Sequence, residues 1–238
     1  MTEQTLVEAL EDAFRQCRDM DASLNERLQA LAAAVRALSP PFADAVDRLV
    51  TRLQRSGAGE AAPGPGDPMP PFVLPDDRGR LVSLDELVSR GPTAVVFHRG
   101  HWCPYCRINT DALARAHGEV GAQGGQIVAI IPDRQQFATE LRTEAQAGFP
   151  VLTDLDNGYA LSLNLAIWLG EEMKRMIAAS GIDLPAYQGN DSWMVPIPAT
   201  FVVGTDGRIK ARFVDPDYRK RMAIEDLLGA LEGAGQSG

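Results

Sequence analysis

The stretch Phe97–Arg107, FHRGHWCPYCR, holds two of the three cysteines of the chain, Cys103 and Cys106. A compact apolar run, TAVVFH at 93–98, leads into it, and apolar residues at helical spacing follow it. Pro104 suits the first turn of a helix, because its missing N–H would have no intrahelical partner there. The stretch therefore predicts a strand, a glycine-containing turn and a helix, with Cys103 at the helix N-cap.

The N-cap position is expected to activate the sulfur of Cys103. It would face the free backbone N–H groups of Tyr105 and Cys106 and the positive end of the helix dipole. Both interactions favour the thiolate, and a lowered pKa makes the sulfur nucleophilic at neutral pH. Cys106 returns to the same face one turn later and can close a small disulfide ring. The geometry thus predicts Cys103 as the attacking and Cys106 as the resolving cysteine.

Two other interpretations of the cysteine pair compete with a redox dithiol. His98 and His101 extend the motif to H-x2-H-x-C-x2-C, which has the residue types of a zinc site. Structural zinc usually takes its ligands from two separated knuckles, however, and the sequence has no second CxxC. Inert buried thiols are the other alternative, although a tryptophan and two cysteines around a proline make a poor core-filling motif. We favour the redox dithiol and expect neither a metal nor an organic cofactor.

Composition narrows the class of protein. The 238 residues are 45% hydrophobic and 23% charged, which is typical of a soluble globular protein. A formal net charge of −9 argues against nucleic acid or an anionic membrane as a partner. The N-terminal sequence MTEQTLVEALEDAF resembles neither a secretory signal nor a transit peptide, and no segment is apolar enough to span a membrane. With only three cysteines, we expect a cytoplasmic protein.

The chain is expected to have three parts. Residues 1–56 carry apolar side chains at helical spacing and predict a helical extension, either packed on the domain or used for dimerisation. Cys17 lies on this apolar stripe, where a small buried thiol is expected. Residues 57–66 are rich in Gly, Pro and Ala and predict a linker. Residues 67–235 then form the main domain.

The main domain alternates strands and helices. The expected elements are strands at 93–98 and 126–131 on either side of the helix from Cys103, a helix at 134–145, helical segments at 157–169 and 171–180, a hairpin of strands at 199–203 and 208–214, and a terminal helix at 224–231. The first three make a parallel βαβ unit, and Thr205-Asp206-Gly207 is a strong hairpin turn. This order predicts an α/β fold, a thioredoxin-like mixed sheet flanked by helices, with the N-terminal helical extension added.

The residues also resemble a known superfamily. WCPYC followed by a helix is similar to the thioredoxin and glutaredoxin active site. The surroundings resemble more closely the peroxiredoxins of the alkyl hydroperoxide reductase/thiol-specific antioxidant group, specifically the peroxiredoxin-like branch with a CxxC centre. The segments that carry this resemblance are GDPMPPFVLPDDRGRLVSLDEL, FHRGHWCPYCRINTDAL, FPVLTDLDN and PATFVVGTDGRIKARFVDPDYRKR. Together they cover residues 66 to about 222 and imply an antioxidant oxidoreductase.

The chain departs from the peroxiredoxin pattern at its centre. Peroxiredoxins show P-x-x-x-[T/S]-x-x-C around the peroxidatic cysteine, whose place here is taken by Cys106, with Cys103 at the Thr position and Arg99 at the Pro position. They also carry a peroxide-binding arginine before a late strand, where this chain has Pro198. Thioredoxins have a cis-proline at that place, so we expect a cis Ile197–Pro198 bond packed against the pair. The resemblance favours Cys106 as the attacker, the N-cap geometry favours Cys103, and we favour Cys103.

Several further residues are expected near the pair. Arg99 can supply the positive charge of the missing arginine, or it can form a surface salt bridge. Trp102 and Tyr105 are expected to wall the site. Asp133 follows the 126–131 strand, and we expect it to cap a helix rather than to carry a proton. The run DPDYRKR at 215–221 is expected to be a solvated turn and helix start, with packing near the site as the alternative, and receives no role.

Three functions are compatible with these residues. In a thiol peroxidase, one thiolate attacks hydrogen peroxide or an organic hydroperoxide, and the resulting sulfenic acid condenses to the Cys103–Cys106 disulfide. An external thiol such as thioredoxin or glutathione then reduces this disulfide. The alternatives are a protein disulfide reductase or oxidase, and a non-catalytic redox sensor whose helical extension binds a partner. A homodimer formed through residues 1–56 is a further expectation.

Overall fold

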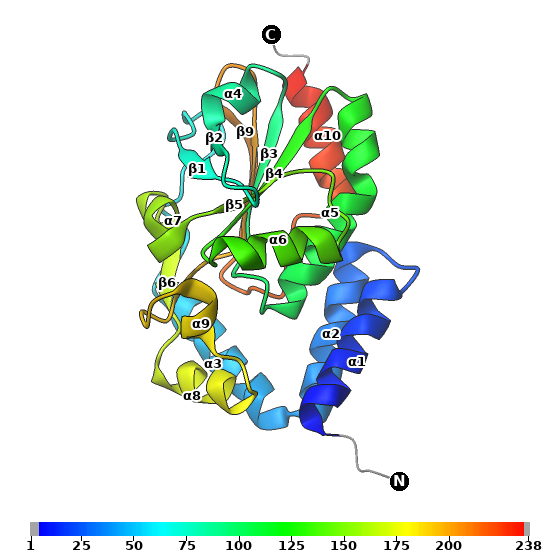
Figure 1. Cartoon of the computed structure of the whole chain (residues 1–238), viewed down its shortest axis with the longest axis vertical. Coiled ribbons are helices and arrows are strands. Elements are labelled where there is room, and N and C mark those ends of the chain that lie inside the picture. The colour runs from blue at the N-terminus through cyan, green and yellow to red at the C-terminus, as the bar shows by residue number, and fades with distance from the viewer. Residues whose placement is uncertain (1–4, 236–238) are drawn as a thin grey trace.

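A five-stranded mixed sheet lies at the centre of the computed structural model, which describes residues 5–235 (Figure 1). β3 is its middle strand, and all five of its residues are buried. β4 and β5 continue the sheet in parallel on one side, while β8 and β9 continue it antiparallel on the other. In spatial order the strands are β5 (Val151–Thr153), β4 (Gln126–Ile131), β3 (Thr93–Phe97), β8 (Ala199–Val203) and β9 (Ile209–Val214).

Each face of the sheet is covered by its own apolar layer. Alternate residues of a strand point to opposite faces, so Val95 and Phe97 pack into one layer and Ala94 and Val96 into the other. The first layer includes α4 (Leu84–Val88) and α7 (Gly158–Ser162). The second includes α5 (Pro104–Ala122), α6 (Gln135–Glu144) and α10 (Ile224–Gly235). This mixed sheet between helices confirms the predicted fold class.

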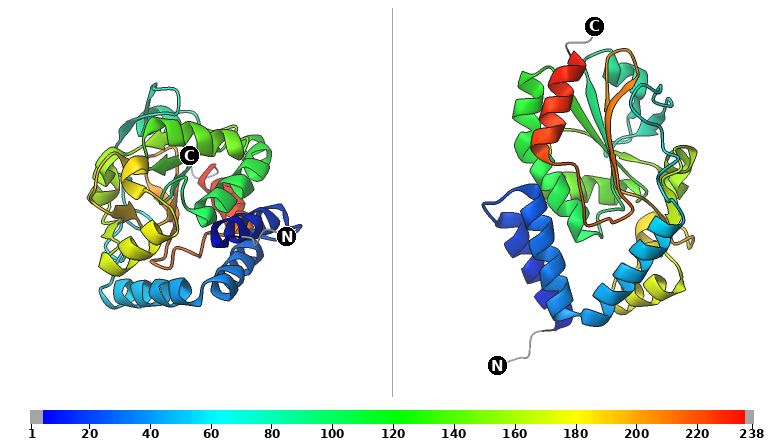
Figure 2. Two further views of the ribbon diagram at one scale, coloured as in Figure 1. Left: turned by 60° about the horizontal axis from the view of Figure 1, so that its bottom comes forward. Right: turned by 180° about the vertical axis from the view of Figure 1, so that it is seen from behind.

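Three helices form the N-terminal part of the described chain: α1 (Leu6–Asp19), α2 (Leu24–Leu38) and α3 (Pro40–Arg55). α1 and α2 each begin with a capping box, and two prolines open α3, where they cost no hydrogen bond. α1 and α2 pack together against α5, whereas α3 crosses to α8 (Glu171–Ala179) (Figure 2). No helix between residues 5 and 235 combines the length and apolarity needed to cross a membrane.

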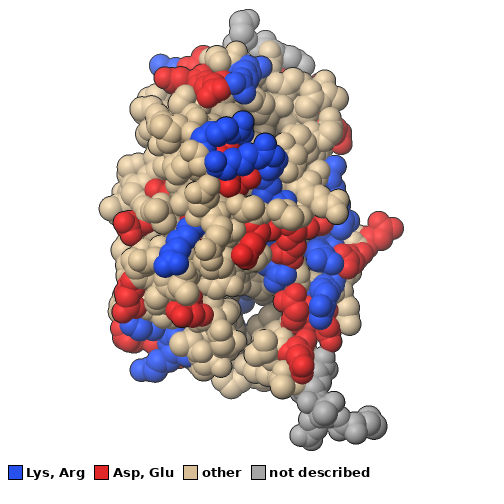
Figure 3. Space-filling model, in the orientation of Figure 1, with Lys and Arg blue, Asp and Glu red and all other residues tan. Residues whose placement is uncertain are grey.

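The N-terminal helices lie below the end of the sheet from which the β3–α5 loop leaves (Figures 1 and 2). Figure 3 shows a hollow in the lower half of the molecule, between the α1–α2 side and the α8–α9 side. α9 spans Leu184–Gln188. Buried residues of α1, α2, α3, α8 and α9 belong to the same apolar cluster as the two cysteines of the motif. The fold therefore places the helices as a cover near the CxxC pair.

The segment 57–66 runs beside the outer strand β9. The backbone N–H of Gly66 donates to the carbonyl of Ile209 (2.8 Å), and Ala62 is buried. The guanidinium of Arg212 on β9 donates to the carbonyl of Ala62. The division of the chain into an extension, a linker and a main domain stays a prediction from the sequence.

The region after α7 differs from the expected helix. Asn164 has a φ of 57°, in the left-handed region that ends a helix, and the backbone N–H of Leu165 turns back to the carbonyl of Ala160 (2.9 Å). The next residues form the short strand β6, Ala166–Trp168, which pairs antiparallel with β7, Met194–Pro196. The prediction of a helix over 157–169 is therefore wrong beyond α7. The remaining elements are β1 (Val73–Pro75), β2 (Leu81–Ser83) and the 3-10 turn η1 (Leu155–Asn157).

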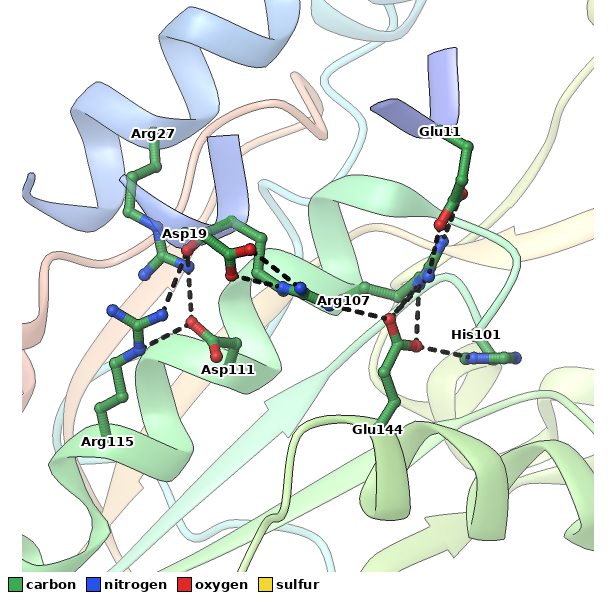
Figure 4. Close-up of polar contacts among 9 residues, drawn as sticks. Glu11, Asp19, Arg27, His101, Arg107, Asp111, Arg115 and Glu144 are labelled. Atoms are coloured by element: carbon green, nitrogen blue, oxygen red, sulfur yellow. Dashed lines mark hydrogen bonds and ion pairs between the residues drawn. The ribbon is translucent and has the colours of Figure 1, made fainter. Parts of the chain in front are cut away.

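Arg27 joins the first two helices to the main domain. Its side chain, only 2% exposed, donates to the carbonyls of Cys17 (3.2 Å) and Arg18 (2.5 Å) near the end of α1. It also pairs with Asp111 on α5 at 2.5 Å, and Asp111 is shared with Arg115 (Figure 4). Cys17 itself is buried, as expected, and burial raises the pKa of its thiol.

Replacing Arg27 by leucine should lower the free energy of unfolding by about 2–4 kcal/mol, because breaking a buried ion pair also leaves its partners unsatisfied. Urea unfolding followed by circular dichroism measures the change. The matched control is Arg36→Leu, which removes an exposed arginine that pairs with Asp44 and Asp47 on α3 and should cost less than about 1 kcal/mol. Equal losses in the two variants would contradict the role given to Arg27.

Candidate active site

The loop between β3 and α5 carries both cysteines of the motif. Cys103 is the N-cap of α5, with extended backbone angles (φ −92°, ψ 112°), and Pro104 opens the helix, as the sequence predicts. Both thiols are free and buried, with 1% of Cys103 and none of Cys106 exposed. The Cys103 side chain accepts no full capping hydrogen bond, but the backbone N–H of Cys106 still lowers the pKa of its thiol, as the N-cap position predicts. Other groups contribute more to its charge.

Two arginines lie against the pair. The guanidinium of Arg99 stacks over the rings of Tyr218 (3.8 Å to the centroid) and Trp102 (4.7 Å), and its backbone N–H donates to Sγ of Cys106 (3.3 Å). Nη2 of Arg221 donates to the same sulfur at 3.4 Å. Arg99 is only 2% exposed and forms no ion pair within the described residues, so the surface salt bridge expected as its alternative is not formed.

The two sulfurs hold their protons unequally. Burial raises the pKa of Cys103, but the hydrogen bond with Cys106 and the positive charges of Arg99 and Arg221 outweigh it and bring the pKa to about 6. Burial, the same hydrogen bond and the negative charge of Cys103 raise the pKa of Cys106 well above its usual range. Near neutral pH the pair therefore carries one thiolate, on Cys103, with the Cys106 thiol as its hydrogen-bond donor.

Aromatic side chains surround the arginines. The indole N–H of Trp102 donates to the carbonyl of Arg99 (3.1 Å). The rings of Tyr105 and Tyr218 meet edge to face, with centroids 5.3 Å apart. Burial raises the pKa of both phenols, so neither adds a negative charge to the site. The low-dielectric surroundings strengthen every charge interaction of the cysteine pair.

The segment 215–221 reaches the site, so the expectation of a solvated turn is wrong and the alternative of packing near the site is confirmed. Tyr218 and Arg221 are both buried. The strand register explains their position, because Phe97 pairs with Ala199 and Ala199 pairs with Val214. β3 and β9 thus end in the same row of the sheet, and the chain after β9 begins beside the loop after β3. The strand order of the predicted fold was the available clue to this neighbour.

The two histidines of the motif diverge. His98 is buried with Nε2 3.3 Å from Oγ1 of Thr110, and burial together with the charge of Arg221 lowers its pKa to about 3. His101 instead turns to Glu144 (Nε2–Oε2 3.0 Å), on α6 (Figure 4). Among residues 5–235, no three His, Cys, Asp or Glu side chains gather in a way that could hold a metal ion.

Arg107 holds the active-site loop in place through Glu144. On α5, it donates to Glu144 on α6 (2.6 Å) and to Glu11 on α1 (3.2 Å), and Glu144 also binds His101 of the loop (Figure 4). Burial raises the pKa of Glu144, but the hydrogen bonds from His101 and Arg107 bring it to about 2. The first helix, α6 and the loop before Cys103 therefore share one ion-pair network.

Comparison with known proteins places this arrangement in a family. The model of the AhpC/TSA family matches residues 65–212. The chain belongs to the AhpC/TSA family. The match begins after the three N-terminal helices and ends within β9, so it contains both cysteines and Arg99 but neither Tyr218 nor Arg221.

Relatives of this AhpC/TSA member are redox proteins. A Mycobacterium tuberculosis protein named as a peroxiredoxin is 30% identical over 146 residues, which cover 61% of this chain and 81% of the relative. The thiol-disulfide oxidoreductase ResA of Bacillus subtilis is 24% identical over 153 residues, covering 64% of this chain and 68% of the relative. The crystal structure of peroxidoxin BcpB from Mycobacterium tuberculosis shares the fold, with a TM-score of 0.55 at 19% identity over 71% of this chain and 97% of that one. The chain is a thiol-dependent oxidoreductase with a thioredoxin-like fold.

Pro198 does not form the cis bond expected from thioredoxins. No peptide bond between described residues is cis, so Ile197–Pro198 is trans. Pro198 is buried and stands directly before β8, whose Ala199 pairs with Phe97 at the end of β3. A proline directly before a strand withholds no ladder hydrogen bond, so it is compatible with this place in the AhpC/TSA chain.

Asp133 is a buried carboxyl, and the expectation that it caps α6 is wrong, because Arg134 is the N-cap. Oδ2 accepts the backbone N–H of His101 (2.7 Å), while Oδ1 has no partner. Burial raises its pKa to about 7, and the negative charge of Cys103 adds to this rise. Gly100 makes room for it, because a Cβ there would lie 2.6 Å from both carboxyl oxygens.

Asp133→Asn should stabilise the protein increasingly as the pH rises. The folded-state pKa of about 7 lies above the ordinary 3.8, so the unfolded chain loses this proton first and the wild type loses stability as the pH rises towards 7. The gap in unfolding free energy between variant and wild type should widen by about 2–3 kcal/mol from pH 5 to pH 7. Urea titrations at both pH values measure it. The exposed Asp21→Asn is the control, and a gap for Asp133→Asn as constant as that control would contradict the burial argument.

Proposed function

We propose that the chain is a peroxidase that reduces hydrogen peroxide or organic hydroperoxides through Cys103 and Cys106. The observation that carries the proposal is the cysteine pair at the N-cap of α5 with the buried side chains of Arg99 and Arg221 against it, an arrangement that lowers the pKa of Cys103 to about 6. A thiolate is the nucleophilic form of cysteine, and its fraction at neutral pH sets its reactivity. Family membership supports the same chemistry.

The reaction runs in two steps on the pair. The Cys103 thiolate attacks one peroxide oxygen, the O–O bond breaks, and the products are a sulfenic acid on Cys103 and an alkoxide or hydroxide that takes up a proton. The Cys106 sulfur then attacks the sulfenic sulfur, so that the disulfide forms and water leaves. An external thiol returns the pair to its reduced form by exchange.

The remaining site residues have supporting roles in this proposal. Arg99 stabilises the negative charge, and Trp102 and Tyr105 shield it from water. Pro104 fixes the start of α5, and Pro198 closes the site from the neighbouring strand. Because the sulfurs are buried, a small peroxide is the substrate class that suits them best, and the hollow in the lower half of the molecule is its proposed entrance (Figure 3).

A disulfide oxidoreductase without peroxidase activity is the second candidate. The observation in its favour is the uncharged Pro198, which stands where peroxiredoxins carry their peroxide-binding arginine. Three parts of the proposal come from the sequence. They are a cytoplasmic location, an external reductant such as thioredoxin or glutathione, and a homodimer formed through residues 1–56.

Stopped-flow mixing of the reduced protein with hydrogen peroxide, followed by tryptophan fluorescence, tests which cysteine attacks. The wild type should react roughly 30-fold faster than a free thiol at pH 7 from its thiolate fraction alone, given a pKa of about 6 for Cys103. Cys103→Ser should abolish the fast phase, and Cys106→Ser should keep it but stop at a sulfenic acid. Cys17→Ser is the control and should behave as the wild type.

Two outcomes would contradict these assignments. A fast phase that survives only in Cys103→Ser would make Cys106 the peroxidatic residue. A rate no higher than that of a free thiol in every variant would favour the disulfide oxidoreductase, which a disulfide-exchange assay with a model disulfide then checks.

The rate of the fast phase should also follow the charge of Cys103. Because the pKa of this thiol is about 6, the second-order rate constant should be nearly constant above pH 7 and fall about tenfold per unit well below pH 6. A pH series in the same stopped-flow experiment measures the midpoint. A midpoint near the ordinary thiol value would show that Cys103 is not activated.

A further inference from the structure

The described chain buries three arginines, and they differ in their partners. Arg27, Arg99 and Arg221 are each at most 4% exposed. Arg27 pairs with the carboxylate of Asp111. Arg99 and Arg221 form no ion pair with any described carboxylate, and Nε of each has no hydrogen-bond partner. Arg221 donates to the backbone carbonyls of Tyr218 and Lys220, and Arg99 lies over two aromatic rings, but these partners carry no negative charge. A buried cation without an opposite charge is costly, so a nearby anion stabilises both residues.

Of the described ionisable groups around the two arginines, only the cysteine pair can supply a negative charge. Their guanidinium charges both act on Cys103, and Arg221 also donates to the sulfur of Cys106. The neighbouring phenols of Tyr105 and Tyr218 stay protonated, because burial raises the pKa of each. His98 is uncharged. Asp133 binds the loop backbone and contacts neither arginine. The counter-charge is therefore the thiolate of the cysteine pair.

We propose that Arg99 and Arg221 make Cys103 and Cys106 a strongly oxidising couple, because closing the disulfide removes the anion that faces both buried cations. The reduced pair keeps one thiolate against them, whereas the disulfide is neutral and leaves two positive charges uncompensated. Any interaction that stabilises the reduced form alone raises the reduction potential. This proposal rests on the proposed peroxidase function and adds the chemical class of the thiol that reduces the disulfide.

That class is a small monothiol. In the exchange reaction, a thiolate of glutathione attacks one sulfur of the Cys103–Cys106 disulfide, breaks the S–S bond and forms a mixed disulfide. A second glutathione thiolate attacks the glutathione sulfur of this mixed disulfide and breaks its bond to the protein sulfur, so that oxidised glutathione leaves and the pair regains one thiolate and one thiol, with one proton taken up by the thiol. Two electrons pass from two glutathione molecules to the disulfide. An oxidising disulfide favours this direction without a reducing protein dithiol, and its burial favours a small reagent.

The equilibrium with reduced and oxidised glutathione at pH 7, measured by alkylating the free thiols, tests the inference. Arg221→Gln and Arg99→Gln should each make the disulfide about tenfold more stable, equivalent to about 30 mV in potential. Arg221→Lys keeps the charge and should stay closer to the wild type than Arg221→Gln. The matched control is Arg219→Gln in the same segment, whose side chain pairs with Asp217 and Asp47, and it should leave the equilibrium unchanged.

A second measurement needs no variant and guards against misfolding of Arg99→Gln. Because the couple and the fold are linked in one thermodynamic cycle, the oxidised wild type should unfold at a lower urea concentration than the reduced wild type. A more stable oxidised form would overturn the inference. The same equilibrium constant with glutathione for Arg221→Gln and Arg219→Gln would also overturn it. Neither measurement uses peroxide. A peroxidase that fails the glutathione test refutes this inference alone, and an oxidising pair that does not react with peroxide refutes the proposed function alone.

Discussion

The charge of a single thiolate between two buried arginines is the interaction on which the active site depends. Arg99 and Arg221 stay inside an aromatic and apolar cluster without carboxylate partners, and Cys103 stays ionised despite complete burial. Each of these states would be costly alone, and together they compensate each other. The helix N-terminus contributes less to this charge than the Cys106 thiol and the two arginines. The pair is thus activated by a hydrogen bond inside the CPYC motif together with arginine side chains outside it.

The sheet topology brings these side chains together. β3 delivers Arg99 and both cysteines at its end, and β9 ends in the same row and delivers Arg221. Arg107 and Arg27 then attach α1 and α2 to α5 through Glu11 and Asp111, so the N-terminal helices remain close to the site (Figure 4). The parts of the chain before and after the family-matched region therefore both contribute to the surroundings of the cysteines.

Local pattern predicts much of this structure, and tertiary context explains the rest. The strand 126–131 and the helix after Cys103 follow directly from apolar runs, proline placement and glycine turns, and their order yields the fold class. The end of α7 depends on one left-handed residue, Asn164, which helical spacing does not reveal. Asp133 follows a strand as a capping residue would, yet Gly100 lets the loop close over it. Arg221 lies 115 residues from Cys106, so only the strand order connects them.

The family match ends at residue 212, and Arg221 lies beyond it. Two proteins with the same residues throughout the matched region would still differ in thiol chemistry if one lacked this arginine. The segment 215–221 thus acts as a separate tuning element, through which a change of one side chain can alter the charge around the cysteine pair while the motif and the sheet stay the same.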